Sequence, residues 1–151
     1  MSVELLNESG WEVDEAKIVR CVEFCLAKLH VHPAAETSVA LVDTETMERL
    51  HVQWLDLDGP TDVMSFPMDE LRPGTPERPT PAGLLGDVVL CPEVAAEQAR
   101  EAGHGFMHEV LLLTVHSVLH LLGYDHADEL ERTEMFTLQD DLLKEFVAAD
   151  A

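Results

Sequence analysis

Apolar and polar positions follow one another along the chain in patterns that predict interleaved helices and strands. Over residues 14–29, apolar residues recur every three or four positions, as on one face of an amphipathic helix, and Asp14 is placed to cap its N-terminus. Short apolar runs rich in Val and Leu have the length of strands. The expected helices span residues 14–29, 43–55, 92–102, 106–122 and 128–147, and the expected strands span residues 3–6, 37–42, 63–66 and 84–90. Because these elements interleave without strict alternation, we expect an α+β fold in which a small mixed β-sheet packs against about five helices.

The predicted helix over residues 106–122 is apolar on nearly all of its faces. Such a helix is normally buried, so we expect it to run through the centre of the fold. Residues 68–81 instead contain four prolines among charged side chains, a composition that predicts an exposed loop. The length of 151 residues suits one domain with one core, and we expect residues 1–151 to form a single domain.

The charge of the chain is strongly negative. Thirty acidic residues against nine basic ones give a formal net charge of -21, which opposes a polyanionic partner at long range. Salt screens this repulsion beyond about 8 Å, so a nucleic acid could still bind at a local site. The lysines and arginines are scattered and form no basic run, so counterion release would contribute little to such binding.

The cysteines and the N-terminal segment indicate a cytoplasmic protein. Cys21, Cys25 and Cys91 are odd in number and lack the spacing of a disulfide framework, which fits reduced thiols. Cys21 and Cys25 share a helix face with apolar neighbours, and we expect them to pack in the core. The N-terminus has no secretory pattern, and no run of about eighteen apolar residues could cross a membrane.

The string HSVLHLLGYDH over residues 116–126 has the spacing of a metal site. On a helix, His116 and His120 lie about 40° apart around the axis and about 6 Å apart along it, so both imidazoles can point at one ion. Gly123 can adopt the left-handed conformation that ends a helix, and the chain can then return His126 to the same point. Three imidazoles with a fourth position open are typical of catalytic zinc, whose bound water has a pKa near 7 and can act as nucleophile or base.

This string also has the spacing of the metzincin protease signature HExxHxxGxxH. The glutamate that acts as general base in those proteases is replaced here by Ser117, which disfavours peptide cleavage by that mechanism. A metal-dependent hydrolase acting on another substrate remains an alternative.

Three blocks together resemble the YbeY family of bacterial endoribonucleases and rRNA maturation factors. They are PTDVMSFP at residues 60–67, LLGDVVLC at residues 84–91 and HSVLHLLGYDH at residues 116–126, and the resemblance extends in register from the first helix to the last. It implies a small mixed sheet with helices, including a zincin-like metal helix. It assigns one zinc ion to three ligands, namely His116, His120 and His126.

The resemblance implies a zinc-dependent endoribonuclease, specific for single strands, that acts in 16S rRNA 3′-end maturation and ribosome quality control. It names ribosomal RNA and the small ribosomal subunit as partners. Many family members have an arginine after an aromatic residue shortly before the ProThrAsp block, and here Leu55 follows Trp54. This difference and the acidity favour an alternative, a ribosome assembly factor with little nuclease activity that docks through basic ribosomal proteins.

Polar residues near these blocks are candidates for substrate binding and catalysis. Thr61, Asp62 and Ser65 interrupt a strand-like block and are expected to line a substrate-binding cleft near the ion, with local turn bonding as the alternative for Thr61 and Asp62. Asp125 could orient a ligand imidazole or assist proton transfer, or it could be a turn residue. Together with the ligand His116, it forms the predicted catalytic set.

Other polar residues are assigned structural roles. Asp87 stands in an apolar strand and is expected to make a specific hydrogen bond, because an unpaired buried carboxylate is costly. His104 and His108 are four residues apart but too far before His116 to share its ion. His51 has no partner spacing, and a surface or packing role is predicted for it.

Overall fold

The computed structural model describes residues 2–55 and 61–151, apart from the side chain of Leu55. The strands are β1 (Ser2–Asn7), β2 (Glu36–Leu41), β3 (Val63–Pro67) and β4 (Leu84–Leu90), and the helices are α1 (Glu15–Lys28), α2 (Thr44–Leu55), α3 (Pro92–Ala102), α4 (Phe106–Leu121) and α5 (Glu129–Ala149). These bounds confirm each of the elements predicted from apolar patterning, with ends that differ by two residues or fewer. None of the helices in these ranges is both long and apolar enough to cross a membrane.

The four strands form one mixed sheet in the order β1-β2-β4-β3. β2 pairs in parallel with β1 on one side and with β4 on the other, while β3 runs antiparallel to β4. The predicted α+β fold with a small mixed sheet is therefore confirmed. β3 has a neighbour on one side only, so its other side is an edge of the sheet.

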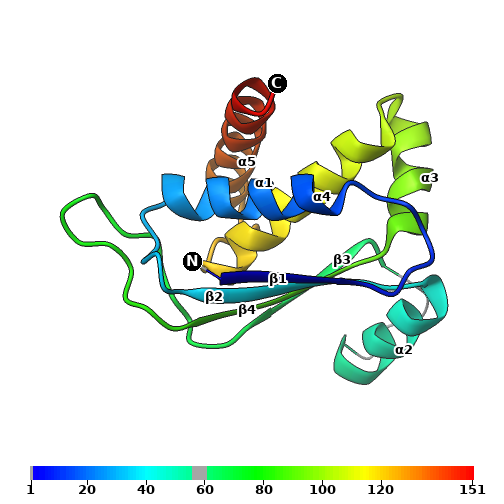
Figure 1. Cartoon of the computed structure of the whole chain (residues 1–151), viewed down its shortest axis with the longest axis horizontal. Coiled ribbons are helices and arrows are strands. Elements are labelled where there is room, and N and C mark those ends of the chain that lie inside the picture. Colours follow the sequence, from blue (N-terminus) through cyan, green and yellow to red (C-terminus); the bar gives the residue numbers. More distant parts are fainter. Residues whose placement is uncertain (1, 56–60) are drawn as a thin grey trace.

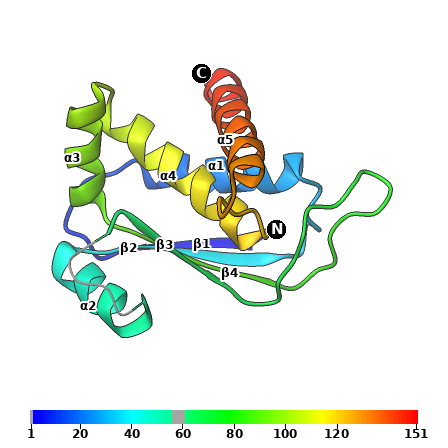
Figure 2. The same ribbon diagram turned by 180° about the vertical axis from the view of Figure 1, so that it is seen from behind.

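The helices cover the two faces of the sheet unequally. Figures 1 and 2 show α1, α3, α4 and α5 on one face, whereas α2 lies at one end on the opposite side. α4 contacts α1, α3 and α5 as well as β3 and β4, so it is the central helix of the fold. Its position agrees with the apolar character of nearly all of its faces.

Two apolar clusters hold these layers together. The main core joins buried residues of α1, α4, α5 and the sheet, including Ile18, Leu85, Leu119 and Phe146. A smaller cluster below the sheet packs Met47 of α2 against strand and strand-end residues, namely Val42, Met64, Val89 and Cys91. This second cluster fixes α2 against the face of the sheet opposite to α4.

Side-chain caps define where several helices begin. The Asp14 carboxylate accepts a hydrogen bond from the Lys17 amide at 3.1 Å, and Asp43 accepts one from the Thr46 amide at 2.8 Å. Asp14 therefore caps α1 as predicted, and Asp43 caps α2, because an oxygen at this position satisfies an amide of the first turn. Cys21 and Cys25 are fully buried, as predicted.

The loop over residues 68–81 is mostly exposed but is attached to the domain. The Gly74 amide donates to the Leu29 carbonyl at 2.9 Å, and the Thr80 amide donates to the His30 carbonyl at 2.8 Å. Thr80 itself is buried. The predicted exposed loop is therefore confirmed over most of its length, and Thr80 is buried where backbone hydrogen bonds attach the loop to the segment after α1.

Candidate metal centre

His116 and His120 lie one turn apart near the C-terminal end of α4, on the same face of the helix. The helix ends as the spacing predicts, because Gly123 adopts a φ of 94° in the left-handed region. The Gly123 amide donates to the His120 carbonyl at 3.0 Å, and the Tyr124 amide donates to the Leu119 carbonyl at 3.0 Å. These two bonds form a Schellman motif, which reverses the chain directly after the second histidine.

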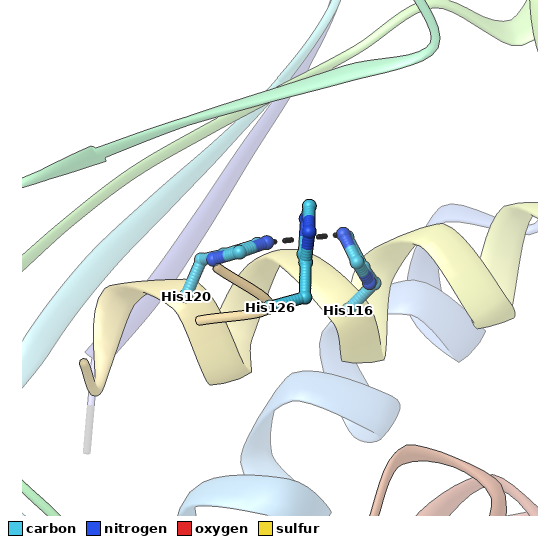
Figure 3. Close-up of side chains that lie close together, drawn as sticks. All are labelled: His116, His120 and His126. Atoms are coloured by element: carbon cyan, nitrogen blue, oxygen red, sulfur yellow. Dashed lines mark hydrogen bonds between the residues drawn. The ribbon is translucent and has the colours of Figure 1, made fainter. Parts of the chain in front are cut away.

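The reversal brings His126 back to the two helical histidines (Figure 3). One ligand atom from each imidazole lies within 4.8 Å of the others, and the three form the only such cluster of potential metal ligands in the described residues. The Nε2 atoms of His116 and His120 are 3.1 Å apart. Two donor atoms on one tetrahedral zinc ion would be separated by about 3.3 Å, given zinc–nitrogen bonds of about 2.05 Å.

Hydrogen bonds on the far side of two rings determine which nitrogen faces the site. Nδ1 of His120 donates to the Tyr124 carbonyl at 2.9 Å, because a carbonyl oxygen can only accept. Nδ1 of His116 lies 2.7 Å from Oε1 of Gln139, which is likewise an acceptor. In neutral rings each Nε2 then carries a lone pair, and both lone pairs can bind one cation placed between them. The donor set fits a metal ion.

The charge state of His120 also suits the binding of a metal ion. Burial lowers the pKa of its imidazole, and His116 and His126 lower it further, while the Tyr124 carbonyl and the Asp125 carboxylate act in the opposite direction. The net effect keeps His120 neutral near pH 7. A neutral imidazole is the form that coordinates a metal.

The histidines open onto a cavity of about 670 Å³. One wall is formed by the three histidines and the turn from Gly123 to Asp125, and the facing wall is formed by residues 61–67, which include all of β3. Thr61, Asp62 and Ser65 are among these wall residues, so the structure brings the predicted polar set to the same cavity as the histidines.

The polar wall residues make specific contacts. Asp62 accepts from the Val63 amide at 2.7 Å and, through its other oxygen, from Nε2 of Gln98 at 3.2 Å. The Thr61 hydroxyl donates to Asp62 at 3.3 Å. Thr61 and Asp62 therefore make the local hydrogen bonds that were expected as an alternative. They also line the cavity, so both roles are present. Asp125 accepts from the His126 amide at 2.7 Å, which binds it directly to the segment that carries the third histidine.

Comparison with known proteins gives the family of the chain. The family model described as Endoribonuclease YbeY matches residues 6–147. This chain belongs to the YbeY family. It is similar to Endoribonuclease YbeY of Clavibacter michiganensis subsp. michiganensis, with 62% identity over 99% of this chain and 98% of that protein. The protein of the same name in Mycobacterium tuberculosis is 60% identical over 98% of this chain and 85% of its own length.

A solved structure has a similar fold. The solution structure of TM1509 from Thermotoga maritima superposes with a TM-score of 0.64 at 27% identity, covering 99% of this chain and 91% of that one. The side chain of Leu55 and residue Pro60 of the first block lie outside the described residues.

Ser117, which stands where the metzincin signature has its glutamate, is fully buried. Its hydroxyl oxygen lies 2.5 Å from that of Ser65 on β3, so one of the two donates to the other. The buried hydroxyl therefore has a partner, and the three histidines of this YbeY protein converge. This contact joins α4 to the edge strand across the base of the cavity.

Four residues of the site were not found from the sequence. His51 and Trp54 of α2 line the cavity, a more specific position than the surface or packing role predicted for His51. Gln139 of α5 contacts His116, and the Phe136 ring stacks on His116 and His126 with ring centroids 6.0 Å and 6.1 Å away. Of these four residues, only Gln139 could have been suspected from the sequence, because it is a polar residue on the apolar face of α5.

Other predicted polar residues lie elsewhere. The Asp87 carboxylate accepts from the Ser38 hydroxyl at 2.5 Å, which confirms the expected hydrogen bond. His104 contacts Glu109 through Nε2 at 2.5 Å and packs beside His108. Neither histidine lines the cavity, in agreement with the prediction that they do not share the ion of His116.

Proposed function

We propose that this protein is a zinc-dependent endoribonuclease that cleaves single-stranded RNA. The observation that carries the proposal is the convergence of His116, His120 and His126 in a cavity of a YbeY fold, because three imidazoles leave a coordination position open. Curated YbeY relatives at about 60% identity are named endoribonucleases. We expect the substrate to be 16S rRNA near its 3′ end, during maturation and ribosome quality control in the cytoplasm.

The residues around the histidines prepare the site for zinc. Gln139 and the Tyr124 carbonyl hold His116 and His120 with Nε2 facing the cavity. Zinc bound there would supply Lewis-acid stabilisation of phosphoryl charge and a solvent ligand acidic enough to react near pH 7. The ligand His116 and its neighbours therefore form the predicted catalytic centre.

Asp125 is the carboxylate of the cavity wall that we assign to proton transfer. One of its oxygens accepts from the His126 amide, which orients the carboxylate. Its second oxygen can accept a proton from a substrate hydroxyl or from water and return it to the leaving group. We assign substrate contacts to the Thr61 and Ser65 hydroxyls on the facing wall, and Asp62 positions that wall through its bonds to Val63 and Gln98.

A second candidate function is favoured by the charge of the cavity. No lysine or arginine lines it in the described residues, whereas Asp62 and Asp125 do. An acidic protein meets basic ribosomal proteins more readily than bare RNA. The second candidate is therefore an assembly factor that docks on the small ribosomal subunit through such proteins and has little nuclease activity.

The two functions are separated by measuring zinc content and cleavage of structured ribosomal RNA for matched histidine variants. His116→Ala removes a ligand, whereas His108→Ala removes an exposed histidine from the same helix outside the cavity. The nuclease function predicts zinc loss and at least a hundredfold slower cleavage in His116→Ala only. Equal cleavage by both variants and the wild type would exclude this site as the nuclease. A 2′,3′-cyclic phosphate product would exclude direct attack by water as the sole route.

A further inference from the structure

Trp54 is an exposed indole on the wall of the histidine cavity. It lies in the last turn of α2, and 60% of its surface is accessible. The cavity lining includes it together with the three histidines. Its position on the wall of the histidine cavity distinguishes it from the other exposed tryptophan, Trp11, which does not line that cavity.

A second aromatic ring orients this indole. The ring centroids of Trp54 and Phe66 are 6.1 Å apart with an interplanar angle of 73°, which is an edge-to-face contact. Such a contact fixes the tilt of the indole without covering it as a parallel stack would. Phe66 belongs to β3, so the indole is supported by the strand that forms the opposite wall from the histidines.

The electrostatics of the cavity determine what kind of ligand the indole can serve. The described lining contains the carboxylates of Asp62 and Asp125 but no lysine or arginine. Binding through phosphates depends on such cations, and a formal charge of -21 weakens it further. Stacking of bases on aromatic side chains needs no cation, and it requires bases whose faces are free.

We propose that Trp54 is the stacking platform for one unpaired nucleobase of the RNA next to the histidine site. This inference rests on the proposed ribonuclease function. The indole would hold a nucleobase beside the cavity while the adjacent phosphodiester lies at the histidines. Paired bases are already stacked within a helix and cannot use the platform, so Trp54 contributes selectivity for unpaired RNA.

Binding is measured with zinc-loaded protein and a short RNA of known sequence in unpaired and duplex forms. In a Trp11→Phe background, Trp54 is the sole tryptophan, since the chain has two. Its fluorescence should fall on titration with the unpaired RNA and change little with the duplex. Absence of quenching by unpaired RNA would overturn the inference.

Variants at the two tryptophans measure how much Trp54 contributes to the affinity for unpaired RNA. We expect Trp54→Leu to weaken binding of unpaired RNA about ten- to hundredfold and Trp54→Phe to retain part of the affinity. Trp11→Leu is the matched control, because Trp11 stacks on Phe106 away from the cavity and should change affinity by less than about twofold. Wild-type affinity in Trp54→Leu would overturn the inference, as would an equal loss in Trp11→Leu.

The His116→Ala variant keeps this inference distinct from the proposed function. If His116→Ala cleaves RNA as fast as the wild type, the proposed nuclease site fails whatever the tryptophans do. If His116→Ala is inactive while Trp54→Leu binds unpaired RNA normally, only the stacking platform fails. For Trp54→Leu we expect the loss chiefly as a raised KM, with a smaller change in kcat.

Discussion

The guanidinium of Arg72 occupies the space that a side chain at position 123 would need. A β-carbon added to Gly123 would lie 2.6 Å from Cζ and 2.7 Å from Nε of Arg72. Nη1 of Arg72 is held by the carbonyls of Glu70 and Leu71, each at 3.3 Å. The loop after β3 therefore packs against the turn that delivers His126, and the left-handed conformation of the backbone at position 123 favours glycine there.

We expect Gly123→Ala to lower the free energy of unfolding and the affinity for zinc. The φ of 94° is strained for alanine, which costs about 1 to 3 kcal/mol, whereas the exposed Arg72 guanidinium can move aside at little cost. Relief of the strain would move the turn that carries His126, so zinc affinity should fall about tenfold or more. Urea unfolding and competition with a chelator measure the two effects.

Gly103→Ala is the control for this prediction. Gly103 has a φ of 76°, but a β-carbon there would meet nothing within 4 Å. The variant should lose stability through backbone strain and keep its zinc affinity. Equal zinc affinity of Gly123→Ala and the wild type would show that the turn does not set the position of the third histidine.

Replacement of Gln139 should weaken zinc binding from outside the ligand set. In Gln139→Leu, Nδ1 of His116 loses its acceptor, so the ring is free to rotate and to change tautomer. We expect a loss of zinc affinity of about ten- to a hundredfold, while Gln139→Glu, which keeps an acceptor, should retain affinity. Chelator competition measures the difference, and unchanged helical circular dichroism controls for folding. Wild-type affinity in Gln139→Leu would contradict an orienting role.

The elements of the fold could be predicted because each depends on local pattern. Asp14 caps α1 through an amide three residues later, and α4 is buried because nearly all of its residues are apolar. Both features can be read from a short stretch of sequence. The histidine cluster is predictable for the same reason. One helical turn and one Schellman turn, both local, bring His116, His120 and His126 together.

The rest of the site depends on how distant elements pack. His51 and Trp54 reach the cavity because Met47 packs α2 beneath the sheet, a contact that no periodicity specifies. Gln139 forms a hydrogen bond with His116, although the two residues are 23 positions apart in the sequence. Its place four residues after Met135 on a buried stripe could have suggested a buried polar contact, but the partner follows only from the packing of α5 on α4.

The hydroxyl pair Ser65 and Ser117 should show energetic coupling. Ser117 is fully buried, and removal of its hydroxyl leaves the Ser65 hydroxyl with the Ser117 carbonyl at 3.5 Å as a weaker partner. We expect Ser117→Ala and Ser65→Ala each to cost about 1 kcal/mol, and the double variant to cost less than the sum by at least about 0.5 kcal/mol. Urea unfolding of the four proteins gives the coupling. Strict additivity would mean that the contact contributes nothing.

The thiols should be unreactive in the native protein. Cys21, Cys25 and Cys91 are all buried and free. The hydrogen bond with Cys25 and burial raise the pKa of Cys21, and burial raises the pKa of Cys91, so both stay as unreactive thiols at neutral pH. We expect an aromatic disulfide reagent to label fewer than one thiol per chain within minutes in buffer at pH 7.5. In urea above the unfolding midpoint, where the packing of α1 is lost, it should label three. Rapid labelling of a thiol in buffer would mean that α1 or the β4–α3 junction opens without global unfolding, because the thiolate forms only when the side chain reaches water.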